Sequence, residues 1–181
     1  MILLYNHTRL ADVPLRAVLS HAARVMGVAG HVAVKVTEGR RGKCSGVAYH
    51  GYPYIGFLKG LPHAKRRVAD RLLDCPDGWV ALVVPSPTLT AGRRSELDAA
   101  ENIYHVALHE MAHILAFRQG TDLPTPRTPS GRQIAHDRRP CEVQAENLVY
   151  DVRKRVPGPR QETLILGLAL DYERAGRCGR C

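Results

Sequence analysis

The sequence predicts a single α+β domain built around a small, mostly antiparallel sheet. Three observations lead to this fold class: β-forming segments are concentrated before residue 90, helical periodicity occupies most of the remainder, and the composition is that of an ordinary globular protein. The chain has 181 residues, 45% hydrophobic and 24% charged, which is enough to bury one sizeable core. We expect residues 1–175 to form one domain and residues 176–181 a flexible, cysteine-containing tail.

Strand and helix alternate at the start of the chain. Residues 2–5 (ILLY) have the character of a short apolar strand, and residues 13–26 carry apolar side chains at helical spacing until two glycines interrupt the pattern. Residues 31–36 place valine at every second position, as a half-buried strand does. The opening of the chain is therefore expected to be a strand, a helix and a second strand.

Two further strands are expected before the helical part. The segment 46–60 mixes β-forming residues with glycine and Pro53, which favours an edge strand or an exposed hairpin over a central strand. Residues 79–84 (WVALVV) form a compact apolar strand that Pro85 closes.

Helices fill the rest of the sequence. The longest is expected between Ser95, which has capping-box spacing to an aspartate, and Gly120, which has the form of a C-terminal stop. A proline-rich loop over 121–139 follows, and then a helix from Pro140 to about residue 155. A last helix is expected over 161–174.

The five cysteines do not indicate a disulfide framework. Their number is odd, and charged residues interrupt the first thirty positions, so no secretory segment or membrane span is apparent. We therefore expect a cytoplasmic protein with reduced thiols and no membrane partner. Cys178 and Cys181 have the spacing of a zinc knuckle, but the other cysteines are single, which favours a frayed tail over a structural zinc site.

The chain is basic. Lys and Arg number 26 against 17 Asp and Glu, which gives a net charge of +9 at pH 7 and permits contact with nucleic acid. The basic residues are scattered, however, and no nucleic-acid-binding motif occurs among them. A solvated basic surface is the favoured interpretation.

The stretch HEMAH within the long helix has the spacing of a zinc site. Residues four apart lie one helical turn above each other, so His109 and His113 present their imidazoles to one point. Glu110 projects close enough to hold a water on a metal bound there, as in the H-E-x-x-H arrangement, where zinc lowers the pKa of that water and the glutamate accepts its proton. His105 lies one turn earlier on the same face, but the residue after it is valine, so only one frame is complete.

A catalytic zinc site also needs a third protein ligand, which must come from outside this helix. Glu142 and Glu146 are four residues apart at the start of the next helix, and either can offer a carboxylate. His136, six residues before Glu142, is a further candidate, although zincins with three histidines usually use the longer H-E-x-x-H-x-x-G-x-x-H run, which this chain lacks.

This pair of helices resembles the catalytic core of the gluzincin metallopeptidases. In that family H-E-x-x-H is followed by a glutamate ligand on a downstream helix, and an acid four residues later orients a ligating histidine. The spacing from Glu142 through Ala145 to Glu146 is similar to the E-x-x-A-D version found in membrane-bound gluzincins and, more loosely, in ImmA/IrrE-like proteases, with Glu in place of Asp. The resemblance covers about residues 95–151.

The resemblance implies a zincin-like fold, in which the edge strand of a small sheet borders the active-site helix. Residue by residue, it implies zinc ligation by His109, His113 and Glu142, a general base at Glu110, and an orienting acid at Glu146. The expected function is that of a zinc metallopeptidase acting on a protein or peptide substrate.

The group that stabilises the oxyanion is left open. His136 is our candidate, because gluzincins often bring a His or Tyr to the cleft from a later loop, and Tyr104, Tyr150 and the tyrosines of residues 49–54 compete with it. The alternative function is a basic, nucleic-acid-associated or structural protein that uses zinc as a brace. Glu110 argues against this alternative, since a structural site needs no base. A third possibility is a metal-dependent hydrolase of non-peptide substrates.

Overall fold

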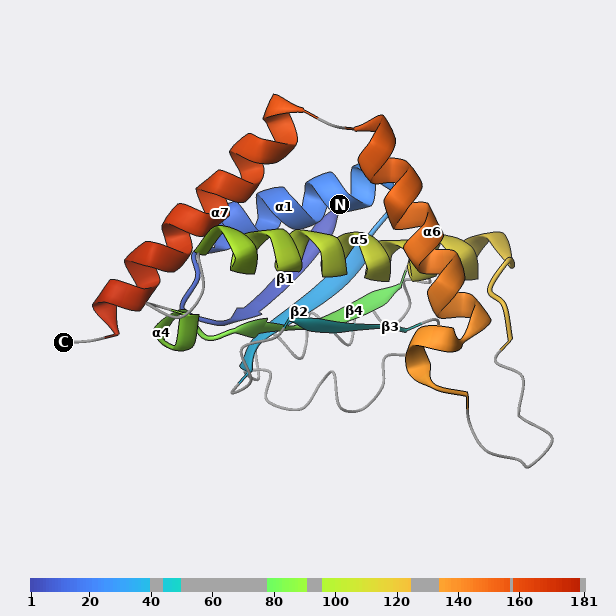
Figure 1. Cartoon of the computed structure of the whole chain (residues 1–181), viewed down its shortest axis with the longest axis horizontal. Coiled ribbons are helices and arrows are strands. Elements are labelled where there is room, and N and C mark those ends of the chain that lie inside the picture. The colour runs from blue at the N-terminus through green and yellow to red at the C-terminus, as the bar shows by residue number, and fades with distance from the viewer. Residues whose placement is uncertain (40–43, 50–77, 91–95, 125–133, 157, 180–181) are drawn as a thin grey trace.

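In the part of the chain that the structure describes, a four-stranded sheet forms one layer, and helices cover one of its faces (Figure 1). This computed structural model describes residues 1–39, 44–49, 78–90, 96–124, 134–156 and 158–179. The strands are β1 (Ile2–His7), β2 (Val32–Gly39), β3 (Ser45–Tyr49) and β4 (Trp79–Pro85), and they lie in the order β1-β2-β4-β3.

The sheet is mixed and mostly parallel. β1 and β2 are joined by the helix α1 (Asp12–Val25) and pair in parallel, because a helical crossover returns the chain to the end of the sheet from which it started. β2 also pairs in parallel with β4, whereas β3 is antiparallel to β4. The α+β fold class is confirmed, but the expectation of a mostly antiparallel sheet is wrong, since the strand–helix–strand opening forms a parallel unit.

β3 lies at an edge of the described sheet. It pairs on one side with β4, from Ser45 opposite Val83 to Tyr49 opposite Trp79. The predicted edge strand is thus confirmed over residues 46–49, and the remainder of the segment, residues 50–60, lies outside the described residues.

The helix α5 (Glu96–Gln119) lies at the centre of the fold. It contacts α1, β3 and β4 as well as two later helices, and its side chains Ile103, Leu108 and Met111 are completely buried. A Cβ on Gly78, the residue before β4, would lie 2.7 Å from Cδ1 of Ile114, so glycine at this position allows the sheet to approach the helix closely. The core therefore fixes the distance between α5 and the sheet.

The end of α5 is a glycine-terminated turn. Gly120 has a φ of 65°, its N–H donates to the carbonyl of Phe117 at 3.2 Å, and the N–H of Thr121 donates to the carbonyl of Ala116 at 3.0 Å. This is the Schellman arrangement, and it confirms the predicted stop. Ser95, the expected cap at the other end, lies outside the described residues.

Two helices, α6 (Pro140–Arg155) and α7 (Pro159–Cys178), cross α5 (Figure 1). A 3-10 turn, η1 (His136–Arg138), precedes α6, and a short helix, α4 (Pro87–Thr90), follows β4. α6 has the predicted bounds. α7 is longer than predicted at both ends, so residues 176–178 are helical, while Cys181 lies outside the described residues.

The apolar side of α7 belongs to the core. Ile165, Leu168 and Tyr172 are buried, and the Tyr172 hydroxyl donates to the carbonyl of Pro85 at 3.0 Å. Among the described helices, none combines the length and the apolar character needed to cross a membrane.

Candidate metal centre

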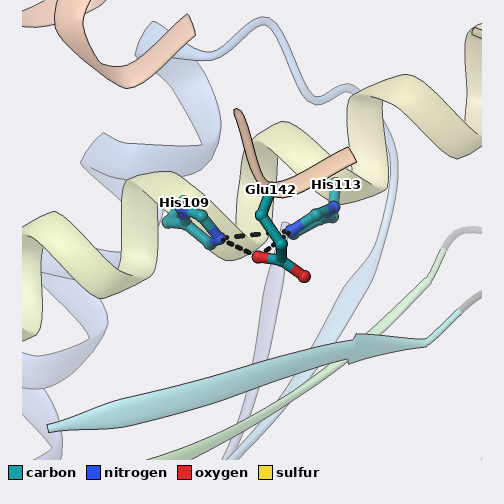
Figure 2. Close-up of side chains that lie close together, drawn as sticks. All are labelled: His109, His113 and Glu142. Carbon is teal, nitrogen blue, oxygen red and sulfur yellow. Dashed lines mark hydrogen bonds and ion pairs between the residues drawn. The ribbon is translucent and has the colours of Figure 1, made fainter. Parts of the chain in front are cut away.

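His109 and His113 project from the side of α5 that faces the start of α6 (Figure 2). Their rings are edge-to-face, with centroids 4.9 Å apart, and the two Nε2 atoms are 3.2 Å apart. The helical spacing explains this convergence, because side chains at i and i+4 lie above each other. The core packing of α5 holds the backbone beneath both rings.

Glu142, in the first turn of α6, brings a carboxylate to the same point. Its Oε2 lies 2.9 Å from Nε2 of His109 and 3.3 Å from Nε2 of His113 (Figure 2). Pro140 begins α6 two residues earlier, so the carboxylate is placed by a helix start rather than by irregular chain. The three side chains form a largely buried group that could hold a metal ion.

The spacing of the three donor atoms fits a metal ion. In a tetrahedral zinc site with bonds of about 2.0–2.1 Å, neighbouring donor atoms are roughly 3.3 Å apart. The three separations found, 2.9, 3.2 and 3.3 Å, are close to this length. Two neutral imidazoles and one carboxylate are a donor set that zinc accepts, and other divalent transition metals accept it too.

Burial and close contacts shift the pKa values of the three side chains. Burial alone would lower the pKa of His109, but its hydrogen bonds to Glu142 and Glu146 raise that pKa above the usual value. Burial and the neighbouring His109 together lower the pKa of His113. Burial would raise the pKa of Glu142, but the two histidines lower it, so the carboxylate stays ionised beside nitrogen donors, as a ligand must.

Glu110 points from α5 toward the edge strand β3. It is buried, and the backbone N–H of Ala48 donates to its carboxylate. A Cβ at Gly46 would lie 2.5 Å from Oε1 of Glu110 and 2.6 Å from its Cγ, so this strand comes close to the helix only because residue 46 is glycine. Burial raises the pKa of Glu110 to about 7; nearby His109 lowers it in part, and nearby Glu142 raises it further.

Glu146 lies on the other side of His109. Its Oε2 is 3.0 Å from Nδ1 of His109, and its Oε1 is 3.2 Å from Nε2 of His105. The carboxylate therefore meets the ring nitrogen opposite the one that faces Glu142 and His113. Glu142, and not Glu146, has the carboxylate that converges with both histidines.

His136 reaches the group from η1. Its Nε2 lies 3.3 Å from Oε1 of Glu142, the oxygen that does not face the two histidines, and its side chain is 71% exposed. Two of the competing tyrosines lie elsewhere: Tyr104 is buried and its hydroxyl lies 3.1 Å from Nδ1 of His21, and Tyr150 is an exposed residue beneath Lys154. Residues 50–54 lie outside the described residues.

A cavity of about 160 Å³ opens beside the group. It lies between β3, α5 and the start of α6, and its walls include Gly46, Ala48, Glu110, His113, His136 and Glu142. Phe117 and Asp122 also line it. The sequence did not single out Gly46, Ala48, Phe117 or Asp122; the one available signal was the position of Asp122 shortly beyond the end of α5, the helix that carries both histidines.

Comparison of the chain with protein-family models, with curated proteins and with solved structures gave no match. The interpretation of the site therefore rests on its own geometry and chemistry.

Proposed function

We propose that this chain is a zinc-dependent metallopeptidase that hydrolyses peptide bonds with a metal-activated water. One observation carries the proposal: His113 and Glu142, which converge with His109, line the same cavity as the buried Glu110. A site that only braces the fold has no use for a base beside the metal, and Glu110 is difficult to explain otherwise, because burying a carboxyl in this position costs stability.

His109, His113 and Glu142 would hold the ion, which gives the three protein ligands that a catalytic zinc site uses. Zinc bound there supplies a Lewis acid that lowers the pKa of a water molecule and polarises the substrate carbonyl.

Glu110 would accept the proton of the attacking water and return it to the departing amine. The backbone N–H of Ala48 donates to this carboxylate and fixes its direction. His136 would donate to the developing oxyanion, because it lines the cavity and its exposed ring remains free to turn toward substrate.

Metal content tests the ligand set. The protein is purified without chelators or a histidine tag, and zinc is measured by elemental analysis in the wild type and in Glu142→Ala and His136→Ala. We expect one zinc per chain in the wild type and in His136→Ala, and loss of zinc in Glu142→Ala, because Oε2 of Glu142 faces both histidines. Zinc that survives in Glu142→Ala but is lost in His136→Ala would assign the third ligand to His136.

Cleavage tests the chemistry. Denatured casein and a mixture of unstructured peptides are incubated with the zinc-loaded protein, and products are identified by mass spectrometry. We expect Glu110→Gln to keep its zinc and to reduce cleavage by about 10²–10⁴-fold, as loss of a general base does. Bound zinc without any cleavage by the wild type would support the alternative, a brace in a basic protein, and binding to nucleic acid that weakens steeply with salt would then be the next measurement.

A further inference from the structure

His105 lies one turn before His109 on α5 and meets the same carboxylate. Its Nε2 is 3.2 Å from Oε1 of Glu146, while Oε2 of Glu146 is 3.0 Å from Nδ1 of His109. Each oxygen of Glu146 thus faces one imidazole, and a continuous polar chain runs from His105 through Glu146 to His109.

Glu146 needs such support to act on His109. It projects from the second turn of α6, its side chain is 54% exposed, and a glutamate has a flexible stem whose freedom is lost when the carboxylate is fixed. Held at one oxygen only, the carboxylate can rotate about its last bond and exchange its histidine partner for water. A second contact at the other oxygen restricts this rotation.

We infer that His105 is a positioning residue for the metal centre. It donates its Nε2–H to Oε1 of Glu146, which keeps Oε2 on the Nδ1–H of His109 and leaves the lone pair of His109 Nε2 directed at the point shared with His113 and Glu142. A carboxylate on the far nitrogen of a ligating imidazole fixes its tautomer and increases its basicity. This inference rests on the proposed function in one respect, the assignment of His109 as a ligand.

The interface between the helices presents His105 and Glu146 to each other. One turn before His105, Glu101 of α5 forms an ion pair with Arg153 of α6, with 2.9 Å between Oε2 and Nη2. This ion pair links the same two helices and involves neither Glu146 nor the group of His109, His113 and Glu142. It therefore offers a matched control for the general effect of loosening the interface.

Zinc affinity is the appropriate readout, because it requires no substrate. We measure the apparent Kd by competition with a chromophoric chelator at one fixed pH for wild type, His105→Ala, Glu146→Gln and the double variant. We expect Glu146→Gln to weaken binding by about 10–100-fold, as removal of a partner of a ligating histidine does. His105→Ala should weaken binding about three- to tenfold, since it acts through Glu146, and the double variant should be no weaker than Glu146→Gln.

Two further variants separate positioning from packing. His105→Gln retains an N–H donor at about the same reach and should recover most of the lost affinity. Glu101→Gln breaks the neighbouring ion pair and should leave zinc affinity within about twofold of wild type.

The inference is overturned if His105→Ala binds zinc as well as wild type, if Glu101→Gln weakens binding equally, or if the losses multiply in the double variant. A wild type that binds no zinc overturns it together with the proposed function. A wild type that binds zinc and cleaves no peptide contradicts the proposed function alone, and the affinities still decide the role of His105.

Discussion

At the scale of single residues, Glu110 combines deep burial with a carboxylate that accepts a hydrogen bond from the backbone N–H of Ala48. In the metal-free protein burial raises its pKa to about 7 from 4.5, and Glu142 adds to the rise. A group whose pKa is raised on folding binds more protons in the folded chain than in the unfolded chain. The stability that it contributes is thus complete below about pH 4.5 and is lost as the pH rises through about 7.

Glu110→Gln removes this titration while it preserves the shape of the side chain. We expect the metal-free variant to gain stability relative to the metal-free wild type as the pH rises, by about 2–3 kcal/mol between pH 5 and pH 8, since one pKa unit corresponds to about 1.4 kcal/mol. Urea unfolding of both proteins in excess chelator, measured at several pH values, checks the difference. Parallel stability curves would show that Glu110 is far better solvated than its 5% exposure indicates.

The residues of the site divide into those that the sequence could predict and those that it could not. One helix carries His109, Glu110 and His113, and another carries Glu142 and Glu146. Helical periodicity alone therefore predicts the relative positions of the side chains within each helix. Nothing local to Gly46 or Ala48 indicates that they lie against Glu110, because that contact joins positions more than sixty residues apart. His105 was placed on the correct face, but its partner depends on how α6 crosses α5.

At the scale of elements, the approach of β3 to α5 is what positions Glu110. The strand supplies an N–H to the carboxylate at Ala48, and it comes this close because Gly46 has no side chain. The proposed metal ligands belong to α5 and α6, so the strand would constrain the proposed base without contributing a ligand. Metal binding and catalysis should therefore be separable by substitution in β3.

Gly46→Ala provides the test. The added Cβ would overlap Oε1 and Cγ of Glu110 at 2.5 and 2.6 Å, so the carboxylate must move, and a displacement of this kind can cost about 10²-fold in rate. Zinc content, measured by elemental analysis, should be unchanged, while peptide cleavage falls. Ser45→Ala, at an exposed position in the same strand, is the control and should retain wild-type cleavage. Full activity in Gly46→Ala would show that the strand does not constrain the base.

The direction in which the strands pair could not be predicted from each element taken separately. Each of the four strands lies where alternation or apolar character predicted one, and the edge position of β3 followed from its glycine and the proline beyond it. The direction of pairing depends on the connection, and α1 between β1 and β2 required a parallel pair. The prediction of a mostly antiparallel sheet rested on strands preceding helices along the chain, and it did not take this helical connection into account.

At the scale of the whole molecule, the group of His109, His113 and Glu142 lies where α6 joins the core helix α5. α5 packs on the sheet, and α6 contacts α5, so the two histidines and Glu142 converge only when both helices are in place. Glu110, Asp122 and Glu142 also give the cavity an acidic lining in a chain of net charge +9. The composition predicted the net charge but not the acidic cavity, since the distribution of charge depends on the fold.

Zinc should therefore stabilise the folded chain as a whole. A ligand that binds only the folded state at one hundred times its Kd contributes about 2.7 kcal/mol. In a domain of this size 1 kcal/mol shifts Tm by roughly 2–4 °C, so we expect zinc to raise Tm by about 5–10 °C over the chelator-treated protein. Differential scanning calorimetry measures the shift.

The same scan on two variants locates the ion within the molecule. Glu142→Ala lacks a donor that meets both histidines, so most of the shift should disappear, whereas Glu110→Gln keeps all three donors and should retain it. An equal shift in wild type and Glu142→Ala would place the stabilising ion elsewhere, with the exposed Cys178 near the C-terminus as the first position to replace. Because the joining of α5 to α6 is what zinc would reinforce, loss of the shift in Glu142→Ala alone would tie the metal to the assembly of the fold as well as to its chemistry.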